Sequence, residues 1–196
     1  MVRILIQQLE KYAEQNNIPI MEEEGIKFLT DYIKENKIKS ILEIGTAIGY
    51  SAIKMALADE DIIVTTIERD EIRYNEAIKN VDAFKLTERI NVLLADAFNI
   101  DITAKFDLIF IDAAKSQYTK FFEIFKHNLN NHGVIVSDNL NFHGLTQNNE
   151  AITSRSLRQM IRKLNDYVEF LKNNEEFDTT FYNIGDGVGI SIKKDQ

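Results

Sequence analysis

The chain has 196 residues, a length that favours one domain with a sizeable hydrophobic core. Hydrophobic residues make up 44% and charged residues 28%, which excludes a disordered, collagen-like or coiled-coil chain. Because there is no cysteine, disulfides, thiolate zinc sites and cysteine nucleophiles are excluded, and any metal must be held by oxygen or nitrogen. The formal charge of -8 argues against a general nucleic-acid coat.

No apolar run approaches the ~20 residues that a membrane span needs, and the N-terminus lacks the basic and apolar regions of a signal peptide. We therefore expect a cytoplasmic protein without membrane contact. The chain has one proline and eight glycines, and no proline- or glycine-rich linker divides it. The sequence predicts a single domain over residues 1–196.

Two helices are predicted at the start of the chain, residues 4–15 and 22–35, and Pro19 separates them. We expect this N-terminal part, residues 1–39, to lie over the ligand edge of a sheet that residues 40–196 form.

From residue 40 onward, short apolar runs rich in β-branched residues alternate with segments of helical period. The predicted strands are residues 40–44, 62–67, 90–94, 106–111 and 133–137. The predicted helices between them are residues 51–58, 71–84 and 118–129. Strands that alternate with helical crossovers indicate a parallel α/β sheet.

The C-terminal part has a different pattern, with a predicted helix at 150–171 followed by strands at 179–182 and 190–193. Three glycines stand at alternate positions in this part, Gly185, Gly187 and Gly189. They indicate a tight turn into a closing antiparallel strand. The predicted fold class is thus α/β and Rossmann-like: a mostly parallel seven-stranded sheet with a C-terminal antiparallel strand and helices on both faces.

Residues 41–51 read as a buried strand that runs into a glycine-bearing turn and a helix start. Gly45 and Gly49 allow the backbone to approach a ligand closely, which is typical of a nucleotide-type site. The spacing matches neither the dinucleotide-binding fingerprint nor the P-loop. An ordinary strand-to-helix turn that needs glycine for its geometry is the alternative.

Two carboxylates at neighbouring strand ends strengthen the nucleotide interpretation. Glu68 follows the second strand, 23 residues after Gly45, where an acidic residue can accept both hydroxyls of a ribose. Asp96 and Ala97 follow the third strand, where a carboxylate and a backbone N–H can meet an adenine edge. An exposed charge at a strand end is the alternative for Glu68.

The next two strands end in polar residues that suit a metal ion. Asp112 follows one strand, and Asp138 and Asn139 follow the other, so parallel neighbours bring them to the same edge. Two carboxylates and an amide oxygen are ligands that suit Mg²⁺. Lys115 lies where an amine could take a proton from a bound hydroxyl, and a surface lysine paired with a carboxylate is the alternative.

Three histidines are present, and they carry little functional signal. His127 and His132 read as structural or solvated residues on the approach to the fifth strand. His143 follows the predicted metal ligands, and we treat it as a candidate substrate contact.

Six motifs together resemble the cation-dependent O-methyltransferases of the catechol and caffeoyl-CoA type: E-I-G-T-A-I-G-Y-S, I-E-R-D, A-D-A-F, F-I-D-A-A-K-S-Q-Y, S-D-N and G-D-G-V-G-I-S. The resemblance runs from about Pro19 to the C-terminus. Within this family the chain is most similar to the short bacterial branch that includes tRNA 5-hydroxyuridine methyltransferase. The resemblance implies the class I methyltransferase version of the Rossmann-like fold, and a homodimer.

The resemblance also implies roles for particular residues. Contacts to S-adenosylmethionine fall on Met21, Gly45, Ser51, Glu68, Ala97 and Asp112, and we expect Glu43 and Asp96 to contact the cofactor as well. Ligands for Mg²⁺, or for another divalent cation such as Mn²⁺ or Ca²⁺, fall on Asp112, Asp138 and Asn139. The family's catalytic lysine falls on Lys115, and we expect Asp112 to be catalytic with it.

The methyl acceptor must carry an acidic hydroxyl next to a second oxygen if the cation is to chelate it. A catechol-like phenol and a 5-hydroxyuridine in a tRNA anticodon loop both meet this requirement. Arg155, Arg158 and Arg162 share one helical face within residues 153–163, which hold no acidic residue and carry a charge of +4. This face favours tRNA phosphates, with a solvated helix face as the alternative. A catalytically silent cofactor- or RNA-binding module on the same fold is a further reading.

Overall fold

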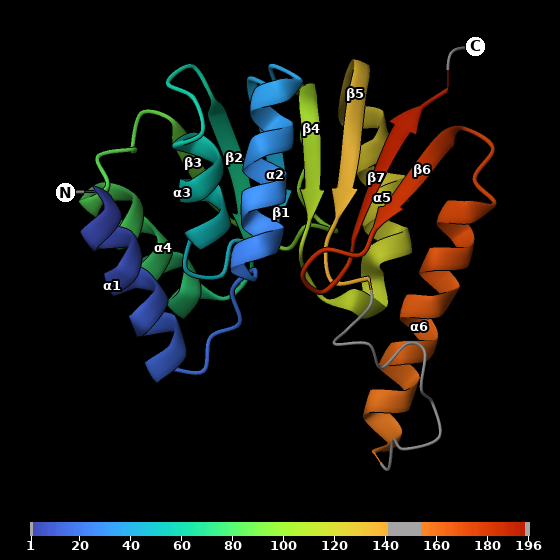
Figure 1. Ribbon diagram of the computed structural model, residues 1–196, viewed down its shortest axis with the longest axis horizontal. Helices are drawn as coiled ribbons and strands as arrows, with labels where there is room; N and C mark the ends of the chain where they lie inside the picture. The colour runs from blue at the N-terminus through green and yellow to red at the C-terminus, as the bar shows by residue number, and fades with distance from the viewer. Residues whose placement is uncertain (1, 141–153, 195–196) are drawn as a thin grey trace. The chain divides into compact units, whose positions relative to one another are not determined.

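Helices and strands alternate along the chain in the computed structural model, which describes residues 2–140 and 154–194 (Figure 1). The chain divides into two compact units, Met1–Ile102 and Thr103–Gln196. Within the described residues, no helix combines the length and the apolar character needed to cross a bilayer.

The first unit contains three parallel strands and four helices among its described residues. Their order is α1 (Val2–Gln15), α2 (Glu23–Glu35), β1 (Ser40–Ile44), α3 (Tyr50–Ala56), β2 (Ile63–Glu68), α4 (Glu71–Ala83) and β3 (Ile90–Leu94). The strand β2 lies between β3 and β1, and Ile44 of β1 is in register with Ile67 of β2. The carboxyl ends of these strands therefore meet at one edge, as βαβ connections require.

Local sequence explains how these elements begin and pack. All residues of β1 except the first are buried, as expected for a strand of a parallel sheet that is covered on both faces. Asp70 caps α4, since its side chain accepts a hydrogen bond from the backbone N–H of Arg73 at 3.0 Å. Pro19 lies between α1 and α2, as predicted.

The second unit contains four strands among its described residues. Its elements are β4 (Phe106–Ile111), η1 (Lys115–Gln117), α5 (Tyr118–Phe125), η2 (Lys126–Asn128), β5 (Leu129–Ser137), α6 (Arg155–Lys172), β6 (Phe177–Tyr182) and β7 (Val188–Lys193). The strands β4 and β5 are parallel. The strand β7 lies between β5 and β6 and is antiparallel to both, although it follows β6 in the sequence.

Aromatic side chains form much of the core of the second unit. Phe122 of α5 packs edge-to-face against Phe177 of β6, with ring centroids 5.0 Å apart. Tyr167 of α6 packs in the same way against Tyr118, at 5.3 Å, and its hydroxyl lies 2.6 Å from the Ser137 hydroxyl. These contacts fix α5 and α6 on the strands.

The predicted α/β class is confirmed: the residues that the structure describes contain seven strands, and the C-terminal one is antiparallel to its neighbours. The largest error is at β5, which begins at Leu129 and not at residue 133. The helix predicted over 118–129 instead ends at Phe125 and continues as the short turn η2. The reason is that the polar run after Leu129 hides the start of the strand. The predicted helix 150–171 is α6, and residues 150–153 lie outside the described part of the chain.

Candidate functional site

The turn after β1 has the backbone conformation that the sequence predicts for a close approach to a ligand. Gly45 and Gly49 have φ angles of 103° and 85°, and Ala47 between them has 47°. A Cβ at Gly49 would lie 3.5 Å from the Ala77 side chain, an ordinary contact distance. Backbone conformation, and not lack of space, is therefore what requires glycine at this position.

Glu68 is held at the end of β2 by backbone donors. Its Oε2 accepts a hydrogen bond from the N–H of Ala47 at 2.8 Å, and its Oε1 accepts from Arg69 and Asp70 at 2.9 Å each. The residue is only 7% exposed. A carboxylate has about four lone-pair sites, so these bonds leave about one free. To accept both hydroxyls of a ribose, as predicted, Glu68 would have to release one backbone donor, the most direct being Ala47.

Glu43 and Ser51, both predicted as cofactor contacts, bond to each other in a buried network. The Ser51 hydroxyl donates to Glu43 Oε1 at 2.5 Å, and the Thr66 hydroxyl donates to Glu43 Oε2 at 2.5 Å. The Thr46 hydroxyl lies 2.6 Å from that of Thr66. Both oxygens of this buried carboxylate therefore bond to the protein, and we interpret Glu43 as a support for the turn.

The third strand end lies next to Glu68, as predicted. The backbone N–H of Ala95 donates to the Glu68 carbonyl at 2.9 Å. Ala97 is buried, whereas Asp96 is exposed and its side chain accepts from the N–H of Phe98 at 2.9 Å. Met21 is buried against Gly25 of α2.

The second unit brings together the four residues predicted for the metal ion and the base. Ile111 is in register with Ser137, and the N–H of Asp138 donates to the Ile111 carbonyl at 3.2 Å. Asp112 and Asp138 therefore follow adjacent strand ends. Asn139 donates from Nδ2 to Asp138 Oδ2 at 2.8 Å and accepts from Lys115 Nζ at Oδ1, at 3.0 Å.

The electrostatics of this cluster are those of charges removed from water. Burial raises the pKa of Asp112, and the Lys115 ammonium opposes that rise. Burial together with repulsion from Asp112 raises the pKa of Asp138, which is only 2% exposed. Burial also lowers the pKa of Lys115, although the nearby carboxylates pull it back up. One ammonium thus faces more negative charge than it can neutralise.

Asp186 is a residue of this cluster that the sequence reading missed. It acts electrostatically on both Lys115 and Asp138. It lies in the turn between β6 and β7, and the Leu140 N–H donates to the Gly187 carbonyl of that turn at 2.9 Å. The sequence signal that could have indicated Asp186 is its place between two glycines, just before the last strand.

The donor set fits a divalent cation. Among the residues that the structure describes, no group of three or more His, Asp or Glu side chains is arranged to hold a metal. The candidate ligands are instead two carboxylates and one amide oxygen, from Asp112, Asp138 and Asn139. Because the two carboxylates repel each other and Asp138 is buried, a cation of charge +2 would remove their repulsion.

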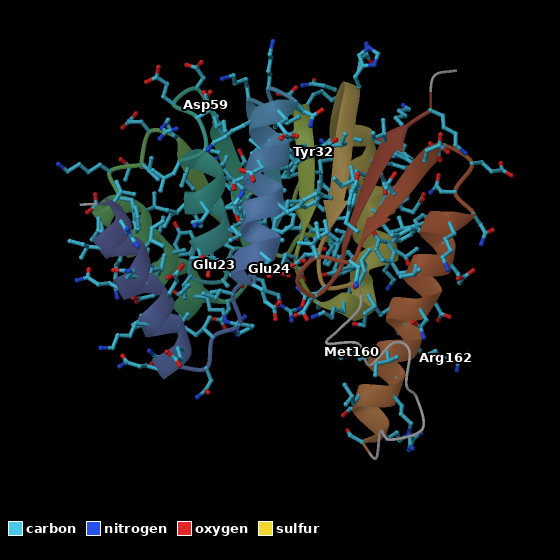
Figure 2. All side chains as sticks on the ribbon, viewed as in Figure 1. Glu23, Glu24, Tyr32, Asp59, Met160 and Arg162 are labelled. Carbon is cyan, nitrogen blue, oxygen red and sulfur yellow. The ribbon has the colours of Figure 1, made fainter. Side chains whose placement is uncertain are left out.

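The predicted substrate contacts lie on α6 and beyond the described residues. Arg155, Arg158 and Arg162 are all exposed on α6. Figure 2 shows Arg162 pointing outward from α6, on the side away from Met160. In Figure 1 the first turns of α6 extend past the ends of β6 and β7. His143 lies outside the described part of the chain.

Comparisons with known proteins show the family and the fold of this chain. A family model described as O-methyltransferase matches residues 2–194. A crystal structure of a candidate caffeoyl-CoA O-methyltransferase from Staphylococcus aureus is 39% identical, with a TM-score of 0.91, covering 96% of this chain and 92% of that one. Caffeoyl-CoA O-methyltransferase from Populus kitakamiensis is 28% identical over 92% of this chain and 80% of its own length.

A further structure is similar in fold. An O-methyltransferase from Bacillus cereus in complex with SAH has a TM-score of 0.81 at 24% identity, covering 97% of this chain and 90% of that one. The Rossmann-like methyltransferase fold that the sequence predicts is therefore confirmed.

Proposed function

Because this chain belongs to the O-methyltransferase family, we propose that it transfers the methyl group of S-adenosylmethionine to a hydroxyl oxygen with the help of a divalent cation. The predicted enzyme class, an O-methyltransferase, is confirmed by the family. The cofactor, the cation and the acceptor belong to the proposal, as do the single domain over residues 1–196, the homodimer and the cytoplasmic location.

The first unit would hold S-adenosylmethionine. The turn from Gly45 to Gly49 offers backbone close to the ligand, Glu68 offers a carboxylate to the ribose, and Asp96 with Ala97 lies at the neighbouring strand end. The Glu43 network would support the turn. Glu43 bonds to the hydroxyls of Ser51 in α3 and Thr66 in β2, and Thr66 in turn bonds to Thr46 in the turn.

The observation that carries the cation is the pair of the half-buried Asp112 and the buried Asp138, whose raised pKa values reflect charge without enough compensation. Asp112, Asp138 and Asn139 would hold the ion, which when bound supplies a positive charge to the acceptor oxygen. Lys115 would then take the proton of the acceptor hydroxyl. Its lowered pKa favours the neutral amine that this task needs.

The acceptor that we propose is 5-hydroxyuridine in a tRNA anticodon loop, converted to 5-methoxyuridine. Its 5-hydroxyl lies beside the 4-carbonyl oxygen, as chelation requires. The supporting observation is the exposed arginine face of α6, which suits phosphate groups and carries no acidic residue within residues 154–163. An anticodon loop also presents an unpaired base, which can enter a site without opening a duplex.

A small catechol-like phenol is the second candidate acceptor. It is favoured by the relatives, which are named for caffeoyl-CoA. The third reading, a silent cofactor- or RNA-binding module, is opposed by the intact set of Asp112, Lys115, Asp138 and Asn139.

The test compares two substrates and one surface variant. The triple substitution Arg155→Glu, Arg158→Glu and Arg162→Glu should abolish methylation of hydroxylated tRNA, because it reverses the charge that contacts phosphates. The wild-type rate on tRNA should also fall as salt rises. Affinity for S-adenosylmethionine, measured by calorimetry, should stay the same in the triple variant.

Two results would decide against tRNA. One is normal tRNA methylation by the triple variant. The other is wild-type protein that methylates a catechol efficiently and ignores hydroxylated tRNA, which would establish the phenol instead. Full activity on every substrate in excess chelator would reject the cation.

A further inference from the structure

A pocket of about 350 Å³ lies in the second unit at the ends of β4 and β5 opposite to the Asp112 and Asp138 cluster. The strand β4 begins at Phe106 and ends at Ile111, so roughly 17 Å of strand separate the two places. The pocket is lined by Lys105, Lys126, His127, Leu129, Asn130, Asn131, Glu176, Phe177 and Lys193. None of these residues belongs to the site proposed for methyl transfer.

An irregularity of β5 shapes this pocket. Phe106 and Leu108 of β4 are two positions apart, but their partners on β5, Leu129 and Val134, are five positions apart. The extra residues of β5 bulge out of the ladder, and they include Asn130 and Asn131. Bulges of this kind redirect side chains, often next to functional sites.

His132 lies in the same bulge and has a φ angle of 66°, a conformation that non-glycine residues adopt infrequently. The strand is therefore held in an unusual shape at the place where its amide side chains reach the pocket. The sequence did not indicate this bulge, because Asn130 and Asn131 are of a residue type that is common in loops.

The lining of the pocket carries a positive charge. It has three lysines against one carboxylate, Glu176. Lys126, whose side chain is only 10% exposed, pairs with Glu176 at 2.5 Å and with Glu123 at 2.9 Å. These ion pairs raise the pKa of Lys126 and lower that of Glu176, so both are charged and Glu176 is already compensated.

The other two lysines of the pocket, Lys105 and Lys193, are placed differently, and Lys193 also acts electrostatically on Glu176. Lys105 donates to the backbone carbonyl of His127, which fixes the ammonium without neutralising it. Lys193 lies at the end of β7. Asn130, which lines the pocket, donates from its side-chain amide to Asp107 at 2.8 Å.

The two units of this acidic protein differ in net charge, which affects how an anion approaches the pocket. Residues 1–102 contain 19 Asp and Glu against 12 Lys and Arg, whereas residues 103–196 contain 12 against 11. The positive pocket therefore lies in the unit whose own charge is close to neutral, so an approaching anion meets less repulsion there.

We propose that this pocket is a second ligand site, which binds an anion bearing phosphate groups. Ammonium groups from two strand ends, a lysine fixed by ion pairs and the amides of the bulge supply donors from several directions, as a group with several oxygens requires. The size of the pocket suits a small phosphorylated compound or a short part of a nucleic-acid backbone.

The experiment is a calorimetric titration of the full chain with inorganic pyrophosphate, in chelator so that no divalent cation takes part. The double substitution Lys105→Ala and Lys193→Ala should weaken binding at least about tenfold, because two charged donors are lost. Lys193→Glu alone should weaken binding as well, and it leaves the Lys105 contact with His127 intact. Lys193→Arg should keep the affinity, and Lys11→Ala, an exposed lysine of α1, is the matched control.

Equal affinity in the wild type and the double variant would overturn the proposal. So would a loss of affinity that follows the Arg155, Arg158 and Arg162 substitutions and not those of the pocket. Competition with tRNA then identifies the source of the phosphate: displacement of pyrophosphate indicates a nucleic-acid backbone, and persistence of pyrophosphate indicates a small phosphorylated compound.

Discussion

Glu43 and Glu68 in the first unit differ from Asp112 and Asp138 in the second unit in what surrounds their carboxylates. Two hydroxyls bond to Glu43, and three backbone N–H groups bond to Glu68. Asp112 and Asp138 repel each other, and the donors near them are the Lys115 ammonium and the Asn139 side-chain amide, which donates to Asp138. All four acidic residues are strand residues or follow a strand end directly.

The difference shows how strand ends can suit two kinds of proposed ligand. Backbone N–H groups fix the carboxylate of Glu68 in place and leave about one lone-pair site for a neutral ligand hydroxyl. Two neighbouring carboxyl groups with few donors cost stability, and they suit a ligand that brings positive charge. Substitutions can change either of these two carboxylate environments separately.

The largest effect is expected from removing one side of the acidic pair. Asp138→Ala should lower kcat/KM for methyl transfer at least about 100-fold, since a ligand of the proposed cation and a charge near Lys115 are both lost. Steady-state kinetics with each candidate acceptor measures this loss. Glu175→Ala, an exposed acidic residue of the same unit, is the control and should leave kcat/KM unchanged. A fully active Asp138→Ala protein would show that the pair has no part in the reaction.

A smaller effect is expected from the satisfied carboxylate. Glu68→Ala should weaken binding of S-adenosylmethionine by about 1–3 kcal/mol, because a charged acceptor of ligand hydroxyls is removed. Calorimetry measures the affinity, and Glu71→Ala in the first turn of α4 is the matched control. Since three N–H groups also lose their acceptor, thermal unfolding must be recorded beside it. Unchanged affinity would remove Glu68 from the ribose role.

The smallest effect is a gain of stability in the absence of cation. The raised pKa values of Asp112 and Asp138 mean that the folded protein favours their protonated forms. This contribution is complete below the unfolded pKa near 4 and is lost as pH rises through the folded pKa values. Asp138→Asn removes one charge of the pair, so its advantage over the wild type should grow from about zero at pH 4 to about 1–2 kcal/mol at pH 9.

Denaturant unfolding of both proteins in chelator, at several pH values, measures this gain. The Asn side chain can still accept the bond from Asn139 Nδ2, so packing is preserved. A wild-type stability that does not fall between pH 5 and pH 9 would contradict the electrostatic account of the pair.

The sequence predicted most strands because short apolar runs rich in β-branched residues are typical of buried strands. The strands β1, β3 and β4 have the predicted bounds. The predicted start of β5 was wrong because pairing with β4 overrode the local preference of the residues for a loop. Residues 130–132 are Asn, Asn and His, which are poor strand formers, yet the pairing of Leu129 with Phe106 draws them into β5.

The site was predictable in residue type and only partly in role. Strand ends identified Glu68, Asp112 and Asp138, because parallel strands gather their carboxyl ends at one edge. Spacing along the chain does not show that Glu43 bonds to two buried hydroxyls, and its predicted contact with the cofactor stays a prediction. Asp186 was missed because its relation to Lys115 depends on the turn between two antiparallel strands.

The place of β7 between β5 and β6 has a consequence for the synthesis of the protein. When β5 leaves the ribosome, one of its edges has no partner until residues 188–193 have also been made. About 50 residues intervene, which is roughly 3 to 10 seconds of translation. During that time the apolar C-terminal part of β5, residues 134–137, exposes unpaired backbone, a template for pairing with other chains. Slowed translation over residues 138–187 should therefore lower the yield of folded protein, and a chaperone that shields strand edges should restore it.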